Sequence, residues 1–448
     1  MKIKFTITAL LLITLSFGQT TWNTDLNDTS IDGRFGEIKV TPSNNLFAVG
    51  NKLGNGLIYF YDGTNWTEIA NPISGIATTI KSIAPVSDTE YYTVSSKRDV
   101  HYYDGTNWTD ISADLPLYNS NVNFDVRILY KTISFSADNV YVVGLFSNSI
   151  EGNQLYVAHF DGSSWTQINV PQSNLIDDNA FGDVIEIDAT DANDIWIAKR
   201  SYFTLSGDYE LGIWHFNGSD WIFEGENLTS FGKVTLRDVD AFAPDDVWFT
   251  GSVFNNSTGV SDAAYIHYDG TVYTLYTETG SSLAVERYCI AKLDDNNVWS
   301  GNESWDPSQE FTFFDGSIWS SQTTLLTSLS GSIWDIKKLN DCLYAVGASD
   351  NLGHPLVIKT CSTPLSVDDI TNTLNQFSFY PNPATNEITL VNYENLDKLY
   401  IFDITGKKVF SSSTITQKVE VQNLKAGVYF IKVIDKIGNQ QTKKMLKK

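Results

Sequence analysis

Hydrophobic and polar residues alternate in short runs along most of the chain, the period of two that is typical of β-strands with one buried face. Examples are "NNLFAVG", "DNVYVVG" and "DDVWFTG", each followed by Gly, Asn, Asp or Ser residues that favour turns. No long segment shows the 3.6-residue period of an amphipathic helix. We therefore predict an all-β fold.

A nine-residue motif, "YDGTNWTEI", recurs six times in altered forms, at spacings from 42 to 57 residues. Each copy has an aromatic residue followed by Asp-Gly or Asn-Gly, and five copies have a Trp three residues after the Gly. Gly tolerates positive φ and Asp or Asn can bond the turn backbone, so the motif predicts a β-hairpin. A calcium loop needs several oxygen ligands, whereas each copy carries at most one carboxylate. The turn glycines are Gly63, Gly105, Gly162, Gly218, Gly270 and Gly316.

A second motif lies upstream of each turn and occurs seven times. Its aromatic anchors are Phe47, Tyr92, Tyr141, Trp196, Trp248, Trp299 and Tyr344. With the apolar stretch before it, each unit has four strands, the pattern of a β-propeller blade. The seventh unit ends at "HPLVIKTC" without a Trp strand, while "TTWNTDL" supplies Trp22 with no blade before it. We predict seven blades, closed by the N-terminal strand onto Leu356–Thr360, which removes the exposed sheet edges.

The first eighteen residues have the features of a secretory signal peptide. Lys2 and Lys4 precede an apolar run, and Ser16-Phe17-Gly18 ends it, so we predict cleavage before Gln19. No other stretch is long and apolar enough for a transmembrane helix. The predicted domains are the signal peptide (1–18), a propeller (19–364), a linker (365–376) and a small C-terminal β-sandwich (377–448).

Charge and cysteine content narrow the partners. The formal net charge is −23, made up of −30 over 19–376, +5 over 377–448 and +2 from Lys2 and Lys4. Because the predicted propeller is this acidic, it repels nucleic acid and anionic lipid, and we expect neither as a partner. Three cysteines are too few for a disulfide framework. Cys342 and Cys361 fall on adjacent predicted strands, where either a disulfide or two buried thiols fit the pattern.

The C-terminal segment carries several motifs in a fixed order: Tyr380-Pro381-Asn382-Pro383, "IFDITGKKV" with Gly406, "LKAGVYFIKV" with Gly427, and a lysine-rich end. Together they resemble the C-terminal sorting domain of the type IX (Por) secretion system of Bacteroidota. The resemblance covers about 72 residues. It implies passage across the outer membrane through the type IX machinery, and a product released or attached to the cell surface.

Four histidines lie close before the turn glycines: His101, His159, His215 and His267. Other repeats have Phe or Tyr at this position, which favours ring packing between sheets over metal binding. No Cys or second His supplies the spacing of a metal site, so we expect no metal and no cofactor.

Basic residues precede or enter the first strands of several units. We predict that Arg34, Lys81, Arg127, Arg237 and Arg287 converge near the central channel and bind an anionic group, with Tyr288 and Trp334 as stacking walls. The alternative is local ion pairing with Glu37, Asp125, Asp238 and Glu286.

Two functions follow. The first is a non-catalytic exported module that binds a glycan or a protein at the cell surface or outside it, since no Ser-His-Asp order and no Glu/Tyr nucleophile pair is evident. The second is a secreted hydrolase or lyase that acts on an anionic polysaccharide at the central pocket. Fold alone does not decide between them.

Overall fold

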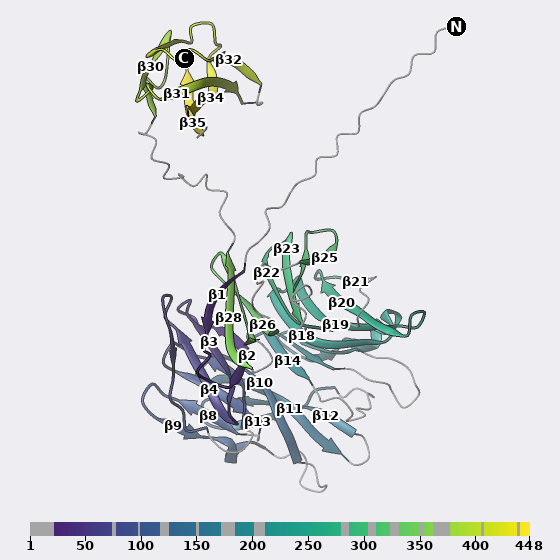
Figure 1. Ribbon diagram of the computed structural model, residues 1–448. Coiled ribbons are helices and arrows are strands. Elements are labelled where there is room, and N and C mark those ends of the chain that lie inside the picture. Colours follow the sequence, from purple (N-terminus) through teal and green to yellow (C-terminus); the bar gives the residue numbers. More distant parts are fainter. Residues whose placement is uncertain are drawn as a thin grey trace, which may run out of the picture. The chain divides into compact units, whose positions relative to one another are not determined.

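The computed structural model describes residues 22–73, 78–96, 99–116, 125–148, 152–171, 184–200, 211–278, 286–302, 311–322, 331–349, 353–361, 377–404, 407–436 and 440–448. The chain divides into two compact units, Met1–Ser362 and Thr363–Lys448. The predicted signal peptide and linker lie outside the described residues. Figure 1 shows that the described part is built almost wholly of strands.

The described residues of the first unit form seven four-stranded antiparallel sheets. The first sheet contains β2 (Gly33–Val40), β3 (Leu46–Lys52), β4 (Asn55–Tyr61) and β5 (Trp66–Glu68). The second contains β6 (Ile80–Pro85), β7 (Tyr91–Ser95), β8 (Val100–Tyr103) and β9 (Trp108–Asp110). The third contains β10 (Asp125–Ser136), β11 (Asn139–Asn148), β12 (Gly152–Phe160) and β13 (Trp165–Ile168).

The next three sheets repeat this order. The fourth contains β14 (Ile185–Asp191), β15 (Asp194–Lys199), β16 (Gly212–Phe216) and β17 (Trp221–Phe223). The fifth contains β18 (Val234–Ala243), β19 (Asp246–Asn255), β20 (Val260–Tyr268) and β21 (Tyr273–Glu278). The sixth contains β22 (Arg287–Asp294), β23 (Asn297–Asn302), β24 (Phe311–Phe314) and β25 (Trp319–Gln322). Two short 3-10 helices, η1 (Ser112–Asp114) and η2 (Gly225–Phe231), follow β9 and β17.

The seventh sheet combines the two ends of the unit. Its strands are β26 (Gly331–Leu339), β27 (Cys342–Ser349), β28 (His354–Cys361) and β1 (Asn23–Asn27), in the order β1-β28-β27-β26. First strands of successive sheets contact one another, and β26 also contacts β2. In Figure 1 the labelled first strands β2, β10, β14, β18 and β26 gather in the middle of the unit.

The repeated turn motif forms the hairpins that the sequence predicts. All six motif glycines have φ between 85° and 91°, a region that disfavours residues with a Cβ. Within the turns, an Asp or Asn side chain accepts backbone N–H groups; Asp62 Oδ1, for example, accepts from Thr64 (2.8 Å) and Asn65 (2.7 Å). The turn prediction is confirmed, and each Asp has a local structural role.

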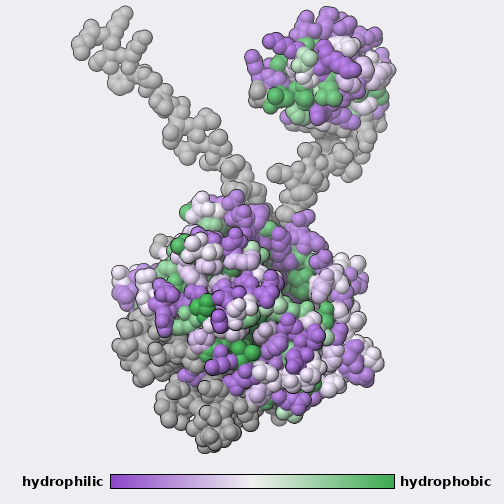
Figure 2. All heavy atoms as spheres, turned by 180° about the vertical axis from the view of Figure 1, so that it is seen from behind, coloured by the Kyte–Doolittle hydropathy of each residue, from purple (hydrophilic) through white to green (hydrophobic). Residues whose placement is uncertain are grey.

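The aromatic anchors form the core between neighbouring sheets. Phe47, Trp196 and Trp299 are at most 2% exposed, and Trp22 stacks on Phe311 at 4.3 Å between ring centroids. Burial of such large rings stabilises the unit mainly through the hydrophobic effect. Figure 2 shows mostly hydrophilic residues on the visible face of the described residues, with hydrophobic residues in scattered patches.

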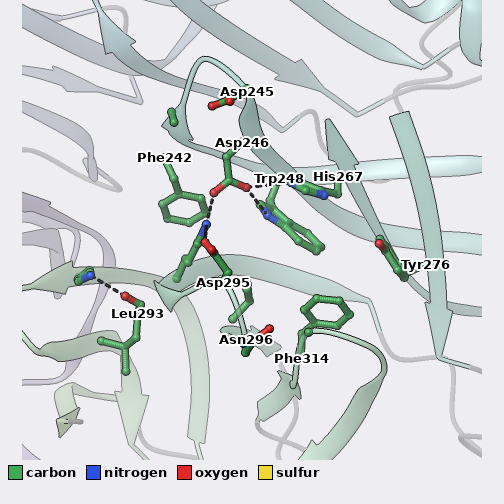
Figure 3. A pocket seen from close by; sticks show the side chains of 15 residues that line it. Phe242, Asp245, Asp246, Trp248, His267, Tyr276, Leu293, Asp295, Asn296 and Phe314 are labelled. Carbon is green, nitrogen blue, oxygen red and sulfur yellow. Dashed lines mark hydrogen bonds and ion pairs between the residues drawn. The ribbon is translucent and has the colours of Figure 1, made fainter. Parts of the chain in front are cut away.

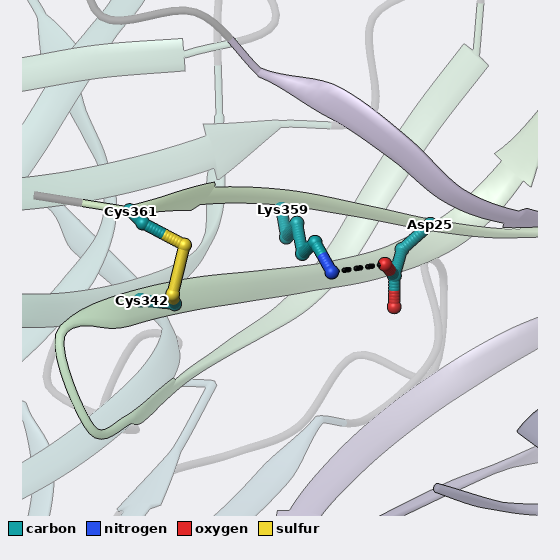
Figure 4. Close-up of a disulfide and its surroundings, with 4 residues drawn as sticks. All are labelled: Asp25, Cys342, Lys359 and Cys361. Carbon is teal, nitrogen blue, oxygen red and sulfur yellow. Dashed lines mark ion pairs between the residues drawn. A yellow bond between two sulfur atoms is a disulfide. The ribbon is translucent and has the colours of Figure 1, made fainter. Parts of the chain in front are cut away.

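The N-terminal strand is tied to the seventh sheet and to the first. Asn23 pairs with Lys359 in the β1–β28 ladder. Asp25 bonds the Lys359 ammonium (2.5 Å) and accepts the indole N–H of Trp66 (2.8 Å). Figure 4 shows this ion pair beside the disulfide that joins Cys342 at the start of β27 to Cys361 at the end of β28. The third cysteine, Cys289, is a buried thiol.

The second unit has a small core between two sheets. One is ordered β29-β30-β33 and the other β32-β31-β34-β35. Buried Leu399, Ile401, Ile431 and Met445 pack between them. The strands are β29 (Ser378–Tyr380), β30 (Glu387–Val391), β31 (Leu396–Asp403), β32 (Lys408–Ser412), β33 (Lys418–Glu420), β34 (Gly427–Asp435) and β35 (Gln440–Lys447).

Candidate functional site

One hollow of about 230 Å³ is lined by residues from the first strands of all seven sheets. We call it the mouth pocket. It exists because six of the first strands contain a β-bulge at the same register, where two residues oppose one on the partner strand. Its lining includes Arg34, Gly36, Lys81, Tyr130, Lys131, Glu186, Arg237, Tyr288 and Trp334.

Beneath the pocket lies a ring of side chains that we call the central belt, one from each first strand. On the second strand of each sheet, the register partner of the belt residue is the residue two positions after the aromatic anchor. The belt residues are Glu37, Ser82, Lys131, Glu186, Asp238, Cys289 and Asp335.

Several belt residues join neighbouring sheets through hydrogen bonds to backbone N–H groups. Asp335 accepts the N–H of Ile38 (2.9 Å), and Glu37 accepts the N–H of Ile83 (2.8 Å). Asp238 accepts the N–H of Ile290 at 2.9 Å. These bonds stabilise the three buried carboxyl groups of Glu37, Asp238 and Asp335.

Lys131 crosses the centre of the belt. Its ammonium lies 3.1 Å from Glu37 of the first sheet and 2.9 Å from Glu186 of the fourth. A side chain that reaches both sheets shows that the first strands converge on one axis. This contact closes the floor of the mouth pocket with paired charges.

The cations of the pocket rim lie against aromatic rings. The Arg34 guanidinium is 4.4 Å from the ring centroid of Trp334, and that of Arg237 is 4.8 Å from Tyr288. The Lys81 ammonium is 5.9 Å from the ring of Tyr130. Such cation–π contacts hold the charged groups in place without neutralising them.

Only some of these cations have carboxylate partners. Arg237 forms an ion pair with Glu286 at 2.5 Å, which is one of the local pairings that the sequence left open. Among the described residues, no carboxylate lies within ion-pairing distance of Arg34 or Lys81. These two groups therefore supply positive charge that is available to a ligand.

Lys81 and Glu186 are among the titratable groups of the pocket whose pKa values are altered. Burial, together with the charges of Lys131 and Arg34, lowers the pKa of Lys81 below its ordinary value. Burial raises the pKa of Glu186 to about 7, although the neighbouring Lys131 acts in the opposite direction. Desolvation is the main cause of both shifts, and only the lowered pKa of Lys81 also reflects neighbouring positive charge.

One predicted arginine lies elsewhere, and another is not tested. Arg287 is 1% exposed, and its guanidinium bonds Glu278 of the fifth sheet at 2.9 Å. It precedes the bulge residue Tyr288, so it occupies the register of Phe35 and Ile80 and faces the core between sheets. Arg127 lies at the first register shift of β10, between Val126 and Ile128, and its side chain is outside the described residues.

The sequence reasoning missed Lys131, Tyr130 and Glu186. A signal for them was present: six of the seven belt residues stand ten positions before their aromatic anchor, as Lys131 does before Tyr141. The pocket residues stand next to them. We instead selected basic residues by their general place before a strand, which does not determine which face they occupy.

Three of the four histidines pack against aromatic rings, as the sequence predicted, but within their own sheets rather than between sheets, because each lies opposite an aromatic anchor on the neighbouring strand. The His215 ring stacks on Trp196 (3.8 Å) and bonds Asp194 (2.7 Å), and His267 stacks on Trp248 (4.2 Å) and bonds Asp246 (2.9 Å). His159 lies against Tyr141 in the same way. Among the described residues, no group of three His, Cys, Asp or Glu side chains is placed to hold a metal ion.

The motif residues of the second unit lie near its last strand. The amide of Asn382 donates to the carbonyl of Lys444 (3.0 Å) and its oxygen accepts the N–H of Leu446 (2.8 Å). Pro381 and Pro383 flank it, Tyr380 is largely exposed at the end of β29, and Gly427 begins β34. Gly406 is outside the described residues.

Residues 378–448 match the family described as the secretion system C-terminal sorting domain. The resemblance found in the sequence is therefore confirmed for this part of the chain. Such a domain implies the type IX machinery as a partner and export to the cell surface or outside the cell. The described part of the chain has no helix with the length and hydrophobicity that a membrane span requires.

The first unit is similar in fold to solved β-propellers. A structure of YCF48 bound to a D1 peptide has a TM-score of 0.51 and 11% identity, covering 77% of this chain and 98% of that one. YCF48 from Cyanidioschyzon merolae has a TM-score of 0.50 and 13% identity, covering 76% and 98%. At such low identity the likeness shows the fold alone, a β-propeller.

A curated relative shares a shorter segment. An endo-acting ulvan lyase of Formosa agariphila is 31% identical over 91 residues, which is 19% of this chain and 17% of that protein. The chain therefore spans less than a fifth of the length of this relative. Taken together, the comparisons show an exported β-propeller protein with a type IX sorting domain.

Proposed function

We propose that this protein binds, without catalysis, the anionic group of an acidic saccharide at the mouth pocket. One observation carries the proposal: Arg34 and Lys81, which have no carboxylate partner among the described residues, line a single hollow. Guanidinium and ammonium groups recognise carboxylate or sulfate through charge-assisted hydrogen bonds. The surrounding domain is strongly acidic, so the positive charge distinguishes this pocket from the rest of the domain.

A saccharide fits the pocket better than an acidic peptide because of the flat rings. Tyr130, Tyr288 and Trp334 stand beside the cations, and their faces can pack against the C–H groups of a sugar ring. A hollow of about 230 Å³ suits one acidic sugar unit or chain end. An acidic peptide as the preferred ligand is the competing outcome.

The experiment compares two forms of one ligand. Oligogalacturonate is titrated into the full-length protein by calorimetry, and the same oligosaccharide is then titrated after reduction of its carboxyl groups. We expect the acidic form to bind and the reduced form to lose at least tenfold in affinity, with binding weakened by salt. Equal affinity for both forms would refute the proposal. Binding of poly-glutamate in preference to any acidic saccharide would also do so.

A polysaccharide lyase is the second candidate. In a lyase reaction, a base removes the proton beside the sugar carboxylate, the C–O bond to the leaving saccharide breaks, and a double bond forms. Glu186 and Lys81 have pKa values shifted toward neutrality, which suits proton transfer, and an ulvan lyase is a partial relative. Release of unsaturated products, detected by ultraviolet absorbance and abolished by Glu186→Gln, would favour this candidate.

We further propose that the seven sheets form a closed propeller. Support comes from the β1–β28 ladder and from the contact between β26 and β2. Replacing Asn23 and Lys359, which are register partners, by Cys should yield an intramolecular disulfide under oxidising conditions. Free thiols or cross-linked dimers would show that this strand does not close the ring in solution.

The domain boundaries belong to the same proposal. We propose that residues 1–18 are removed as a signal peptide, that 19–364 form the propeller, and that 365–376 link it to the sorting domain at 377–448. N-terminal sequencing of the exported protein should begin at Gln19. Retention of the first residues in the exported product would contradict this assignment.

A further inference from the structure

We propose that a second site, between the fifth and sixth sheets, binds an uncharged saccharide. This side pocket is a hollow of about 860 Å³, within the usual range of roughly 300–1,000 Å³ for ligand sites. Its lining includes Phe242, Asp245, Tyr276, Lys292, Asp295 and Asn296. It lies apart from the mouth pocket in residues and shares none of them.

The back of the side pocket is held by a hydrogen-bonded group. Asp246 accepts the indole N–H of Trp248 at 3.0 Å and bonds His267 at 2.9 Å and the ammonium of Lys292. Burial raises the pKa of Asp246, but the bonds from His267 and Lys292 outweigh it, so the pKa is lowered overall. The wall is therefore fixed before any ligand binds, which reduces the entropic cost of binding.

Two half-buried rings flank this wall. In Figure 3, Phe242 lies on the left and Tyr276 on the right, with Asp246 and Trp248 between them. At the register of Tyr276, three other sheets carry a smaller aliphatic side chain: Ile69, Ile111 and Ile168. The fifth sheet thus presents an aromatic surface where those repeats do not.

Polar groups stand at the rim near these rings. Asp245 and Asn296 are exposed on the turns that precede β19 and β23, and the side chain of Asp295 is 90% exposed while it bonds Lys292. Sugars combine apolar C–H faces with many hydroxyl groups, so rings flanked by amide and carboxylate groups match both of their surfaces.

The charge of the side pocket distinguishes it from the mouth pocket. Three carboxylates (Asp245, Asp246 and Asp295) face two ammonium groups (Lys292 and Lys338), and Lys292 is already paired with two of those carboxylates. The other ammonium, that of Lys338, donates to the carbonyl of Leu293 (2.6 Å), and the lining as a whole carries more carboxylates than ammonium groups. The ligand class is therefore neutral, whereas the mouth pocket selects negative charge.

The test uses an array of neutral gluco-, manno-, galacto- and xylo-oligosaccharides with the full-length protein, followed by calorimetry on the best binder. We expect at least one neutral oligosaccharide to bind, and Phe242→Ala to weaken it about tenfold. Phe135→Ala is the matched control, because Phe135 has the same register and is half-buried in the third sheet. This control should leave the affinity unchanged.

Variants at the rim of the side pocket test binding without disturbing the fold. Asp245→Ala and Asn296→Ala alter exposed turn residues, and each should weaken the neutral ligand several-fold without changing the unfolding temperature. Arg34→Gln should not affect it, so failure of this site and failure of the mouth pocket are distinguishable. The proposal is overturned if no neutral oligosaccharide binds, or if Phe242→Ala and both rim variants leave binding unchanged.

Discussion

The mouth pocket and the hollow on the other side of the central belt are alike in size and differ in charge. The second hollow, which we call the far pocket, has a volume of about 210 Å³. It is lined by residues two positions further along the first strands, including Lys39, Asp188, Asp240 and Lys337. Lys337 lies 2.6 Å from Asp240, and Asp188 accepts the N–H of Ala241 at 2.9 Å.

The comparison shows that position near the axis does not by itself make an anion site. Both pockets carry basic side chains, but in the far pocket two lysines meet two aspartates. In the mouth pocket Arg34 and Lys81 meet rings instead. Free positive charge beside flat surfaces, rather than the hollow, is the basis of the proposed function.

The largest expected effect concerns the belt that separates the pockets. Asp335 is 7% exposed and accepts two backbone N–H groups, from Ile38 (2.9 Å) and Ile336 (2.7 Å). Asp335→Ala leaves both donors unsatisfied, at a cost of about 4 kcal/mol in the free energy of unfolding. Chemical denaturation of the purified protein measures this loss.

Asp315 provides a matched control for that variant. It also accepts two backbone N–H groups, from Ser317 and Ile318, both at 2.9 Å, but in an exposed turn. Because water can replace the lost carboxylate, Asp315→Ala should cost only about 1 kcal/mol. Equal losses for the two variants would mean that the belt does not support the sheets as described.

The next prediction concerns Arg287, which, unlike Arg34, lies outside the mouth pocket. Arg287→Gln removes the ion pair with Glu278, whose side chain is 12% exposed, and we expect a loss of about 3 kcal/mol in stability. Affinity for an acidic oligosaccharide should stay within twofold of the wild type, because Arg287 faces the core. A tenfold loss of affinity in a folded Arg287→Gln protein would show that the pocket includes this residue.

The contrast between Arg287 and Arg34 also shows what the sequence could predict. The repeat period, the turn glycines and the histidine positions followed from local patterns, and those patterns persist in the structure. The structure brings Lys81, Arg237, Tyr288 and Trp334 together because each occupies the bulge position of its first strand.

The face of the sheet on which a side chain lies could not be predicted where a bulge interrupts the alternation of side chains along a strand. Arg287 is one residue before the bulge position and turns into the core, while Tyr288 faces the axis. For the same reason Lys131 was passed over in favour of Arg127. The pairing of Lys131 with Glu37 and Glu186 joins sheets that are distant in sequence, which no local pattern indicates.

A smaller effect depends on pH. The pKa of Glu186 is raised to about 7, so this carboxyl is neutral below pH 7 and negative above it. Loss of its negative charge favours a bound anion, and affinity for oligogalacturonate should rise several-fold from pH 8 to pH 6. Glu186→Gln should remove most of this rise.

The same raised pKa also affects stability. The contribution of Glu186 to the free energy of unfolding should decrease as pH rises from its unfolded pKa of about 4.5 toward 7.

The smallest effect is expected in the far pocket. Lys39→Gln removes a cation that lies 3.7 Å from Glu37 on the opposite side of the belt. We expect less than a twofold change in affinity for the acidic oligosaccharide, measured by calorimetry at fixed salt. A larger loss would place ligand contacts beyond the belt and erase the difference between the two pockets.

The most direct measurement is the affinity of the Arg34→Gln/Lys81→Gln variant for oligogalacturonate at low salt. Lys52→Gln/Lys359→Gln, which removes the same charge from half-exposed positions outside the pocket, is the control. Loss of two charge-assisted contacts predicts affinity lower by about 10- to 100-fold in the first variant and nearly unchanged in the second. Equal affinities in the two variants would contradict the account.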